Sequence, residues 1–369
     1  MKENTYLSKN PTHPGLTLDE ELEYIGISQS ELSVRTGLTE KHISNIIRAK
    51  ASISPDTALK LEKVLNLKAS FWLTYQRNYD ESIARIKAEE ELDKEIILLS
   101  KFKDTYNELK KIAILPKLRW NKKNFLGIIK NLHNFFGIDS LAYIEESNIS
   151  AAFRKYKRAK QNNYTIAAWL RLGQIKAQTV ETNAFDEKKL KDSLSEIKKL
   201  SLLDCELQIF KKLEKLLKEL GIVLVCLPNL KNTHSQGACM WLRKDKAVII
   251  LKTRKQSFDK FWFNLFHEIA HLLKHSSKKT FLDLEDDHDS PEEKEADDFA
   301  QKLLLPNFSY SSPKKLNEDD LSLIAKENNV TIDIVAGRLA HLTGAYSYYR
   351  KFIKTIDYQN IDTISVNRE

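Results

Sequence analysis

The chain has 369 residues, with 59 lysines and arginines against 51 acidic residues and a formal net charge of +8 at pH 7. At about 150 residues per domain, this length predicts two or three domains, and the basic balance permits a polyanionic partner without requiring one. Three cysteines with no CxxC pair exclude a disulfide framework. The N-terminal residues lack the apolar stretch of a secretory signal, and no run approaches the roughly 18 apolar residues of a membrane span. We therefore expect a cytoplasmic protein with no membrane partner.

The first 80 residues show short helical patterns, whose interruptions fall at Gly15, Gly26, Gly37 and Pro55. Within them, "SQSELSVRTGLTEKHISNIIRAK" (residues 28–50) has the spacing of a helix-turn-helix, in which the second helix enters the major groove of DNA. Ser33 offers a small side chain at the helix crossing, Gly37 permits the left-handed backbone of a tight turn, and Thr39 can cap the second helix. The residues of that helix that should point inward are Ile43, Ile46 and Ile47.

The outward face of this second helix predicts the contacts to DNA. Residues that would face base edges are Glu40, Lys41, His42, Ser44 and Asn45, and residues that could reach phosphates are Gln29, Lys41 and Arg48. The predicted DNA-binding residues are therefore Gln29, Thr39, Lys41, His42, Ser44 and Asn45. The alternative is an ordinary helical hairpin with a polar surface, and the acidic Glu40 leaves the preferred base sequence open.

Two flanking stretches, "HPGLTLDEELEYIGISQSELS" and "ISPDTALKLEKVLNLKASFWLTYQ", extend the pattern over residues 13–76. They resemble the HigA branch of the Xre-type helix-turn-helix family, although Ser33 stands where that family usually has alanine. The resemblance implies an all-α five-helix domain, which we place at residues 1–80. It also implies that the protein binds double-stranded operator DNA as a homodimer.

Residues 81–114 contain no glycine or proline and carry many Glu/Lys pairs at helical spacing. This pattern predicts one long solvated helix that connects two units. From residue 116 to 220 the apolar residues keep a helical period, with the lysines on a solvated outer face. We therefore assign residues 81–220 to a helical connector region.

At Gly221 the pattern changes to short apolar runs bounded by turn residues, "GIVLVCLP", "GACMWLR" and "AVIILK". Three strands followed directly by a helix predict an α+β domain over residues 221–369. The predicted fold is thus mostly α, with a helix-turn-helix domain, a helical connector, and a small sheet followed by a buried helix.

The buried helix, "FWFNLFHEIAHLLKH" (residues 261–275), is apolar on nearly every side but contains His267, Glu268 and His271. Burial of imidazole and carboxylate groups is costly unless a partner inside the protein satisfies them. The HExxH spacing places both imidazoles on one helix face, where they can bind a single Zn²⁺. Glu268 lies beside them as the candidate catalytic base that takes a proton from water.

A third protein ligand is expected on the next helix, because catalytic zinc usually has three. The stretch "SPEEKEADDFAQKLLLP" predicts that helix, and its start and end are marked by Ser290, Pro291 and Pro306. Periodicity leaves both Glu293 and Glu295 open as the ligand, and Glu293 could instead complete a capping box. Asp297, one turn after Glu293, could accept a hydrogen bond from the outer nitrogen of a ligating histidine.

These two stretches are similar to those of the ImmA/IrrE family of zinc metallopeptidases, a zincin-like fold. The resemblance implies that the metal ligands are His267, His271 and Glu293, with aspartate at position 297 where the family commonly has asparagine. It extends to residues 237–263, where a strand edge could align an extended peptide, to the central stretches 151–158 and 167–175, and to residues 331–349. We expect packing roles for Arg338 and His341, and a solvated charge run rather than a fourth ligand at His288.

Combined, the two resemblances imply a DNA-binding transcriptional regulator that carries a zinc endopeptidase. Its implied protein substrate is a helix-turn-helix repressor or a similar regulator. The alternative is a HigA-like antitoxin or transcription regulator whose zinc domain is a sensor with little protease activity. The intact Glu268 disfavours this alternative, because a purely structural zinc site does not need a base. A plain toxin–antitoxin scaffold is a third possibility, but the sequence has no toxin-like segment.

Overall fold

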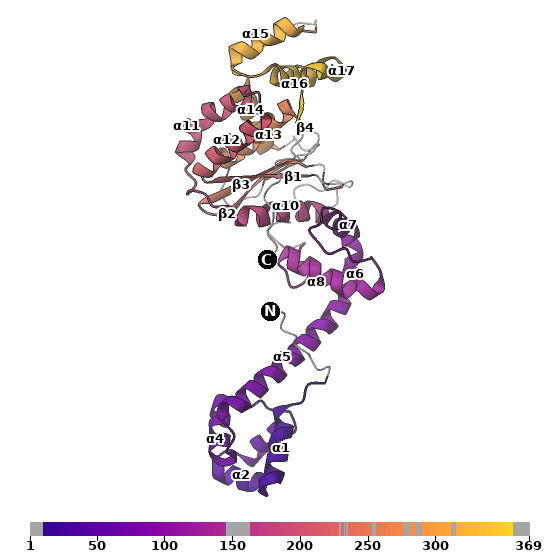
Figure 1. The fold of residues 1–369 in the computed structure, drawn as a ribbon, viewed down its shortest axis with the longest axis vertical. Coiled ribbons are helices and arrows are strands. Elements are labelled where there is room, and N and C mark those ends of the chain that lie inside the picture. Colours follow the sequence, from indigo (N-terminus) through magenta and orange to yellow (C-terminus); the bar gives the residue numbers. More distant parts are fainter. Residues whose placement is uncertain are drawn as a thin grey trace. The chain divides into compact units, whose positions relative to one another are not determined.

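The computed structural model describes residues 10–144, 163–228, 230–231, 233, 235–252, 256–275, 281–284, 290–310 and 315–356. The chain, drawn in Figure 1, divides by its contacts into an N-terminal unit, Met1–Ile97, and a C-terminal unit, Leu98–Glu369. Each unit has a hydrophobic core of its own. Among the described residues, no helix is both long enough and apolar enough to cross a membrane.

The N-terminal unit begins with five helices, which are α1 (Pro14–Ile25), α2 (Gln29–Thr36), α3 (Glu40–Ile47), α4 (Pro55–Leu65) and α5 (Ala69–Lys94). The N-cap residues of α2, α3 and α4 are Ser28, Thr39 and Ser54. The hydroxyl of each accepts a hydrogen bond from the backbone N–H three residues later. In Figure 1, α1 and α4 lie beside the first turns of α5, and α2 packs against α3 and α4. The expected five-helix arrangement is confirmed.

The helix-turn-helix has the expected backbone at its turn, whereas one expectation about α1, the helix that precedes it, is wrong. Gly37 has φ 68°, and the Ser33 hydroxyl donates a 2.6 Å hydrogen bond to the Leu38 carbonyl, which holds the turn against α2. Gly15 was expected to interrupt a helix, but it lies in the first turn of α1. A Cβ atom there would lie 1.9 Å from the carbonyl oxygen of Ile46, so the glycine allows α1 to approach α3 closely.

The segment at residues 81–114 is not one long solvated helix, and this expectation is corrected in its second half. Helix α5 ends at Lys94 and is followed by α6 (Ile96–Leu99), a 3₁₀ helix (Ser100–Phe102) and α7 (Lys103–Lys111). The residues of this half that become buried in a core are Leu99, Phe102, Tyr106 and Leu109. Their burial favours breaks in the helix, because one straight helix would leave some of them in water.

Four longer helices precede the sheet, and they are α8 (Phe125–Phe136), α10 (Asn163–Gln178), α11 (Glu187–Lys199) and α12 (Glu206–Glu219). Helix α10 contacts β1, β2 and β3, and Gly173 lets it approach closely, since a Cβ there would lie 2.1 Å from Ile250 Cδ1. In Figure 1 the sheet lies between α10 on one face and α12, α13 and α14 on the other. The sheet is therefore covered on both faces, which agrees with its strongly apolar strands.

The main sheet contains the three expected strands and one more, in the order β1 (Ile222–Leu227), β3 (Lys246–Lys252), β2 (Ser235–Arg243) and β5 (Phe281–Leu284). β1 pairs with β3 in parallel, and β2 is antiparallel to both of its neighbours. The expected peptide-aligning edge within residues 237–263 is not at Gly237–Cys239, because this segment pairs on both sides; the outer strands of the sheet are β1 and β5. A small second sheet joins β4 (Gln256–Ser257) to β6 (Thr355–Ile356).

The remaining elements of the C-terminal unit are α13 (Phe258–Lys274), α14 (Pro291–Leu304), α15 (Glu318–Asn328), α16 (Ile332–Thr343), α17 (Tyr346–Tyr349) and a 3₁₀ helix (Arg350–Phe352). Helix α13 contacts β2 and β3 on one side and α14 and α16 on the other. It is thus the central helix of this unit, and the α+β character predicted for the last third of the chain is confirmed.

Candidate metal centre and DNA-binding helix

The HExxH motif lies on the central turns of α13, where apolar neighbours exclude water. The exposed fractions of His267, Glu268 and His271 are 0%, 0% and 1%. Phe266, which precedes them, and Ile269, which lies between them, are also fully buried. Three polar side chains in such surroundings require internal partners, since each would otherwise lose its hydrogen bonds to water.

Helix α14 supplies one of those partners. Its N-cap is Ser290, whose hydroxyl accepts the backbone N–H of Glu293 over 3.2 Å, and Pro291 occupies the first position. This start was predicted from the sequence. The Glu293 side chain is only 1% exposed and points to the histidines of α13, so it does not complete a capping box.

His267, His271 and Glu293 converge, and their ligand atoms all lie within 4.8 Å of one another. Glu293 Oε2 is 3.0 Å from His267 Nε2 and 3.4 Å from His271 Nε2, and the two Nε2 atoms are 3.0 Å apart. Zinc–ligand bonds of about 2.0–2.2 Å in a tetrahedral site separate ligand atoms by about 3.3 Å. The spacing of the three atoms therefore fits a single ion of this size.

The hydrogen bonds around the cluster also favour a cation at its centre. Asp297 Oδ1 lies 2.9 Å from His267 Nδ1, so a neutral His267 that keeps its proton on Nδ1 has Nε2 available as a metal ligand. Either a ring proton or a metal ion can supply the positive charge that the Glu293 carboxylate faces. The donor set, two imidazoles and one carboxylate, is one that zinc prefers.

The charges in this cluster shift the pKa of two of its members. Burial alone would raise the pKa of Glu293, but hydrogen bonds with His267 and His271 and the charge of these rings lower it to about 2. Burial lowers the pKa of His271, and Glu293 opposes this shift only in part. At neutral pH these two shifts give a carboxylate beside a neutral imidazole, which are the forms that bind a metal.

A second layer of charge lies behind His267. Asp297 was predicted to hold the outer nitrogen of a ligating histidine, and it contacts His267 in this way. Arg338 on α16 is half-buried, and the charges of Asp297 and Asp298 raise its pKa against the larger lowering by burial. Arg338 therefore sits in the field of the carboxylate that holds His267, whereas His341 is exposed.

The rival ligand, Glu295, lies outside the cluster. Its side chain is half exposed and forms a 2.7 Å ion pair with Lys274 Nζ. His275, which the sequence interpretation did not single out, contacts His271 through a 2.9 Å approach of their Nδ1 atoms. The HxxxH spacing of these two residues could have indicated the contact. His288 lies outside the described residues.

Glu268 lies between α13 and strand β2. A Cβ atom added to Gly237 would come within 2.4 Å of Glu268 Oε1 and 3.1 Å of its Cδ. The absence of a side chain at Gly237 thus gives the Glu268 carboxylate its place beside the sheet. No sequence pattern indicated that this glycine belongs to the candidate site.

The predicted DNA-binding residues lie on or next to α2 and α3 of the N-terminal unit. Thr39 and Lys41 are exposed, and the half-buried members of the set are Gln29, His42, Ser44 and Asn45. Thr39 caps α3 through the N–H of His42, and His42 Nε2 lies 3.5 Å from the Thr57 hydroxyl on α4. The imidazole of His42 therefore already has a polar contact within the protein, whereas the side chain of Lys41 is exposed to solvent.

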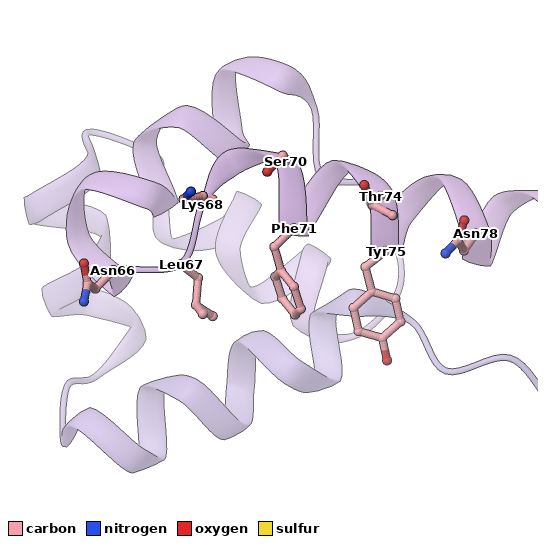
Figure 2. A pocket seen from close by; sticks show the side chains of 8 residues that line it. All are labelled: Asn66, Leu67, Lys68, Ser70, Phe71, Thr74, Tyr75 and Asn78. Atoms are coloured by element: carbon pink, nitrogen blue, oxygen red, sulfur yellow. The ribbon is translucent and has the colours of Figure 1, made fainter.

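An open pocket of about 660 Å³ lies elsewhere on the N-terminal unit, at the junction of α4 and α5 (Figure 2). Its lining residues are Asn66, Leu67, Lys68, Ser70, Phe71, Thr74, Tyr75 and Asn78. None of the predicted metal or DNA-binding residues lines this pocket, and it contains no buried charged group. Size alone therefore does not identify a functional site here.

Comparisons with known proteins agree with both units. The family model described as IrrE N-terminal-like domain, a peptidase family, matches residues 217–340, and a helix-turn-helix model matches residues 22–72. Virulence-associated protein A of Dichelobacter nodosus is 42% identical over 73 residues, which are 19% of this chain and 72% of that protein.

Solved structures, including the following two, also match part of the chain. An addiction module antidote protein of a HigA family from Coxiella burnetii is 33% identical, covering 23% of this chain and 95% of its own, with a TM-score of 0.22. The Pseudomonas aeruginosa antitoxin HigA with higBA promoter is 28% identical, with shares of 23% and 95% and a TM-score of 0.22.

Fold and family matches together define the class of this protein, a helix-turn-helix DNA-binding protein with a metallopeptidase-type domain. More narrowly, the chain carries an Xre-type helix-turn-helix domain matched at residues 22–72 and an IrrE N-terminal-like domain matched at residues 217–340.

Proposed function

We propose that the chain is a DNA-bound transcriptional regulator whose C-terminal unit is a zinc-dependent endopeptidase. The observation that carries the proposal is the buried convergence of His267, His271 and Glu293, with Glu268 next to them on the same helix. The division into residues 1–80, 81–220 and 221–369, with DNA binding, connecting and peptidase roles, is part of the proposal.

His267, His271 and Glu293 would hold the zinc ion, which when bound supplies a Lewis acid that polarises the scissile carbonyl and makes water more acidic. Glu268 takes a proton from water as the water oxygen forms a bond to the carbonyl carbon. It then returns this proton to the leaving nitrogen as the carbon–nitrogen bond breaks. Because Glu268 is fully buried beside Gly237, bulk water does not compete for its proton.

The proposed partners follow from the resemblances of the two units. The protein substrate is a helix-turn-helix repressor or a related regulator, either a partner protein or the chain itself. The nucleic-acid partner is double-stranded operator DNA, bound by a homodimer through Gln29, Thr39, Lys41, His42, Ser44 and Asn45. The proposed location is the cytoplasm.

A second candidate function is that of a HigA-like antitoxin or regulator whose zinc domain acts as a sensor with little protease activity. The observation that favours it is the 33% identity of the N-terminal unit to the HigA-family protein of Coxiella burnetii. The buried Glu268, which a sensor would not need, favours the peptidase.

Substitution Glu268→Gln separates the two functions, because it removes the base without changing side-chain size. For the peptidase, we expect cleavage of a co-expressed repressor to fall by about 100-fold or more, with zinc content and operator binding unchanged. Glu219→Gln, an exposed glutamate of α12, is the matched control and should cleave normally. Equal proteolysis and equal operator-reporter output in wild type and Glu268→Gln would support the sensor instead.

A further inference from the structure

A third histidine extends the candidate metal centre toward the surface. His275 follows the last residue of α13 and lies four residues after His271, so the two rings share one side of the helix end. Their Nδ1 atoms are 2.9 Å apart, and the side chain of His275 is 10% exposed. His271 thus has a partner behind it, as His267 has Asp297.

The contact continues from His275 to helix α14. His275 Nε2 lies 3.4 Å from Glu295 Oε2, and Glu295 Oε1 accepts a 2.7 Å hydrogen bond from Lys274 Nζ. Glu295 is half exposed and stands two residues after Glu293. A chain of polar contacts therefore runs from His271 through His275 and Glu295 to solvent.

Only one arrangement of protons fits this series of contacts when His271 binds a metal through Nε2. A neutral imidazole that offers a lone pair at Nε2 carries its proton on Nδ1. That proton is donated to His275 Nδ1, which must then be the unprotonated nitrogen of its own ring. His275 consequently carries its proton on Nε2, and the Glu295 carboxylate lies 3.4 Å from that nitrogen, an ion-pair distance at which no hydrogen bond between the two is formed in this structure.

We propose that His275 and Glu295 are positioning residues that fix the tautomer and orientation of His271 for metal binding. This inference rests on the proposed zinc site. It also gives Glu295 a role. Glu295 supports His271 indirectly through His275, whereas Asp297 contacts His267 directly. The two metal histidines therefore differ, since one is held by a carboxylate and the other by a neutral ring.

The competing explanation is that these residues only tie α13 to α14. Lys274 provides the control, because Lys274→Met breaks the ion pair between the helices but leaves His275 and Glu295 in place. His275→Phe keeps a ring but removes its nitrogens, whereas His275→Asn can place an acceptor oxygen close to the original Nδ1.

The experiment measures zinc affinity of the full-length chain by competition with a chromophoric chelator, together with the melting temperature of the zinc-free protein. We expect His275→Phe to weaken zinc binding by about 10- to 100-fold, the usual effect of losing a partner behind a metal ligand. His275→Asn and Lys274→Met should each stay within about threefold of wild type, since neither removes the acceptor for His271. Glu295→Ala, at an exposed site, should weaken zinc binding by a smaller factor than His275→Phe.

Several outcomes would overturn the inference. Unchanged affinity in His275→Phe would do so, as would equal losses in His275→Phe and Lys274→Met that follow their melting temperatures. If His275→Phe does not fold, Glu295→Ala tests the inference in its place. Unchanged zinc affinity of Glu295→Ala would then contradict the proposed series of contacts from His271 to Glu295. Nitrogen-15 NMR of the zinc-loaded protein gives a direct check, because a His275 ring protonated at Nδ1 contradicts the proposal. If wild type binds no zinc at all, the proposed function itself fails.

Discussion

Gly237 allows the Glu268 carboxylate to lie against strand β2, so the smallest side chain of the site controls the position of the proposed base. A methyl group at this position would have to displace Glu268 Oε1, the mobile end of a flexible side chain. The backbone of β2 is held on both sides by β3 and β5, so the carboxylate would move before the strand does.

For Gly237→Ala we therefore expect a loss of proteolysis similar to that of Glu268→Gln, with zinc binding retained. The cost in unfolding free energy should be about 1–3 kcal/mol, the usual range for an overpacked interior. Cleavage assays, zinc titration and denaturant unfolding measure these three quantities. In a Glu268→Gln background, Gly237→Ala should reduce cleavage no further. A further loss there would mean that the glycine acts through another group.

At this scale, the sequence predicted what depends on local spacing. HExxH places two histidines on one face, and the start of α14 at Ser290 follows from its capping residues. Periodicity alone left Glu293 and Glu295 as alternatives. In the structure, Glu293 shares the buried face of α14 with Ala296, Ala300 and Leu304, whereas Glu295 is exposed. The role of Gly237 could not be predicted, because only the fold brings it into contact with Glu268, which is 31 positions later in the sequence.

Among the elements, α3 is the helix that the proposed function assigns to the major groove. Its inner face is fixed by Ile43 and Ile46, which are fully buried, so its outer face is fixed as well. Three inward residues were predicted from the 3.6-residue period; the third, Ile47, is only partly buried but packs against the same core. The connector helix was predicted less well, because Glu/Lys pairs indicate a solvated face but do not show that Phe102 and Tyr106 join a core.

The outer face of α3 predicts two different effects on operator binding. His42→Ala combined with Asn45→Ala should remove side chains that face bases, so preference for the operator over other DNA should fall by about 1–3 kcal/mol per lost base contact. Arg48→Ala, at a residue expected to reach phosphates only, should weaken binding to all sequences alike and lower the slope of affinity against salt by about one unit. Gel-shift titrations at several salt concentrations measure both effects. Unchanged sequence preference in the double variant would exclude these side chains from base recognition.

For the whole molecule, the division into two units separates the two proposed activities. The metal ligands all lie in the C-terminal unit and the DNA-binding residues in the N-terminal unit. Each unit has its own buried cluster, so each can lose its structure without the other. A ligand that binds one folded unit should then stabilise that unit alone.

We accordingly expect two transitions when the full-length protein is melted in a calorimeter. Zinc at about 100 times its dissociation constant should stabilise the C-terminal unit by about 2.7 kcal/mol, and a chelator should remove this stabilisation, while the other transition stays in place. Gly15→Ala assigns the remaining transition, because its Cβ would meet the Ile46 carbonyl at 1.9 Å and destabilise the N-terminal unit by about 1–3 kcal/mol. If zinc and Gly15→Ala moved the same transition, the two units would unfold together, and metal occupancy would then be coupled to the stability of the DNA-binding helices.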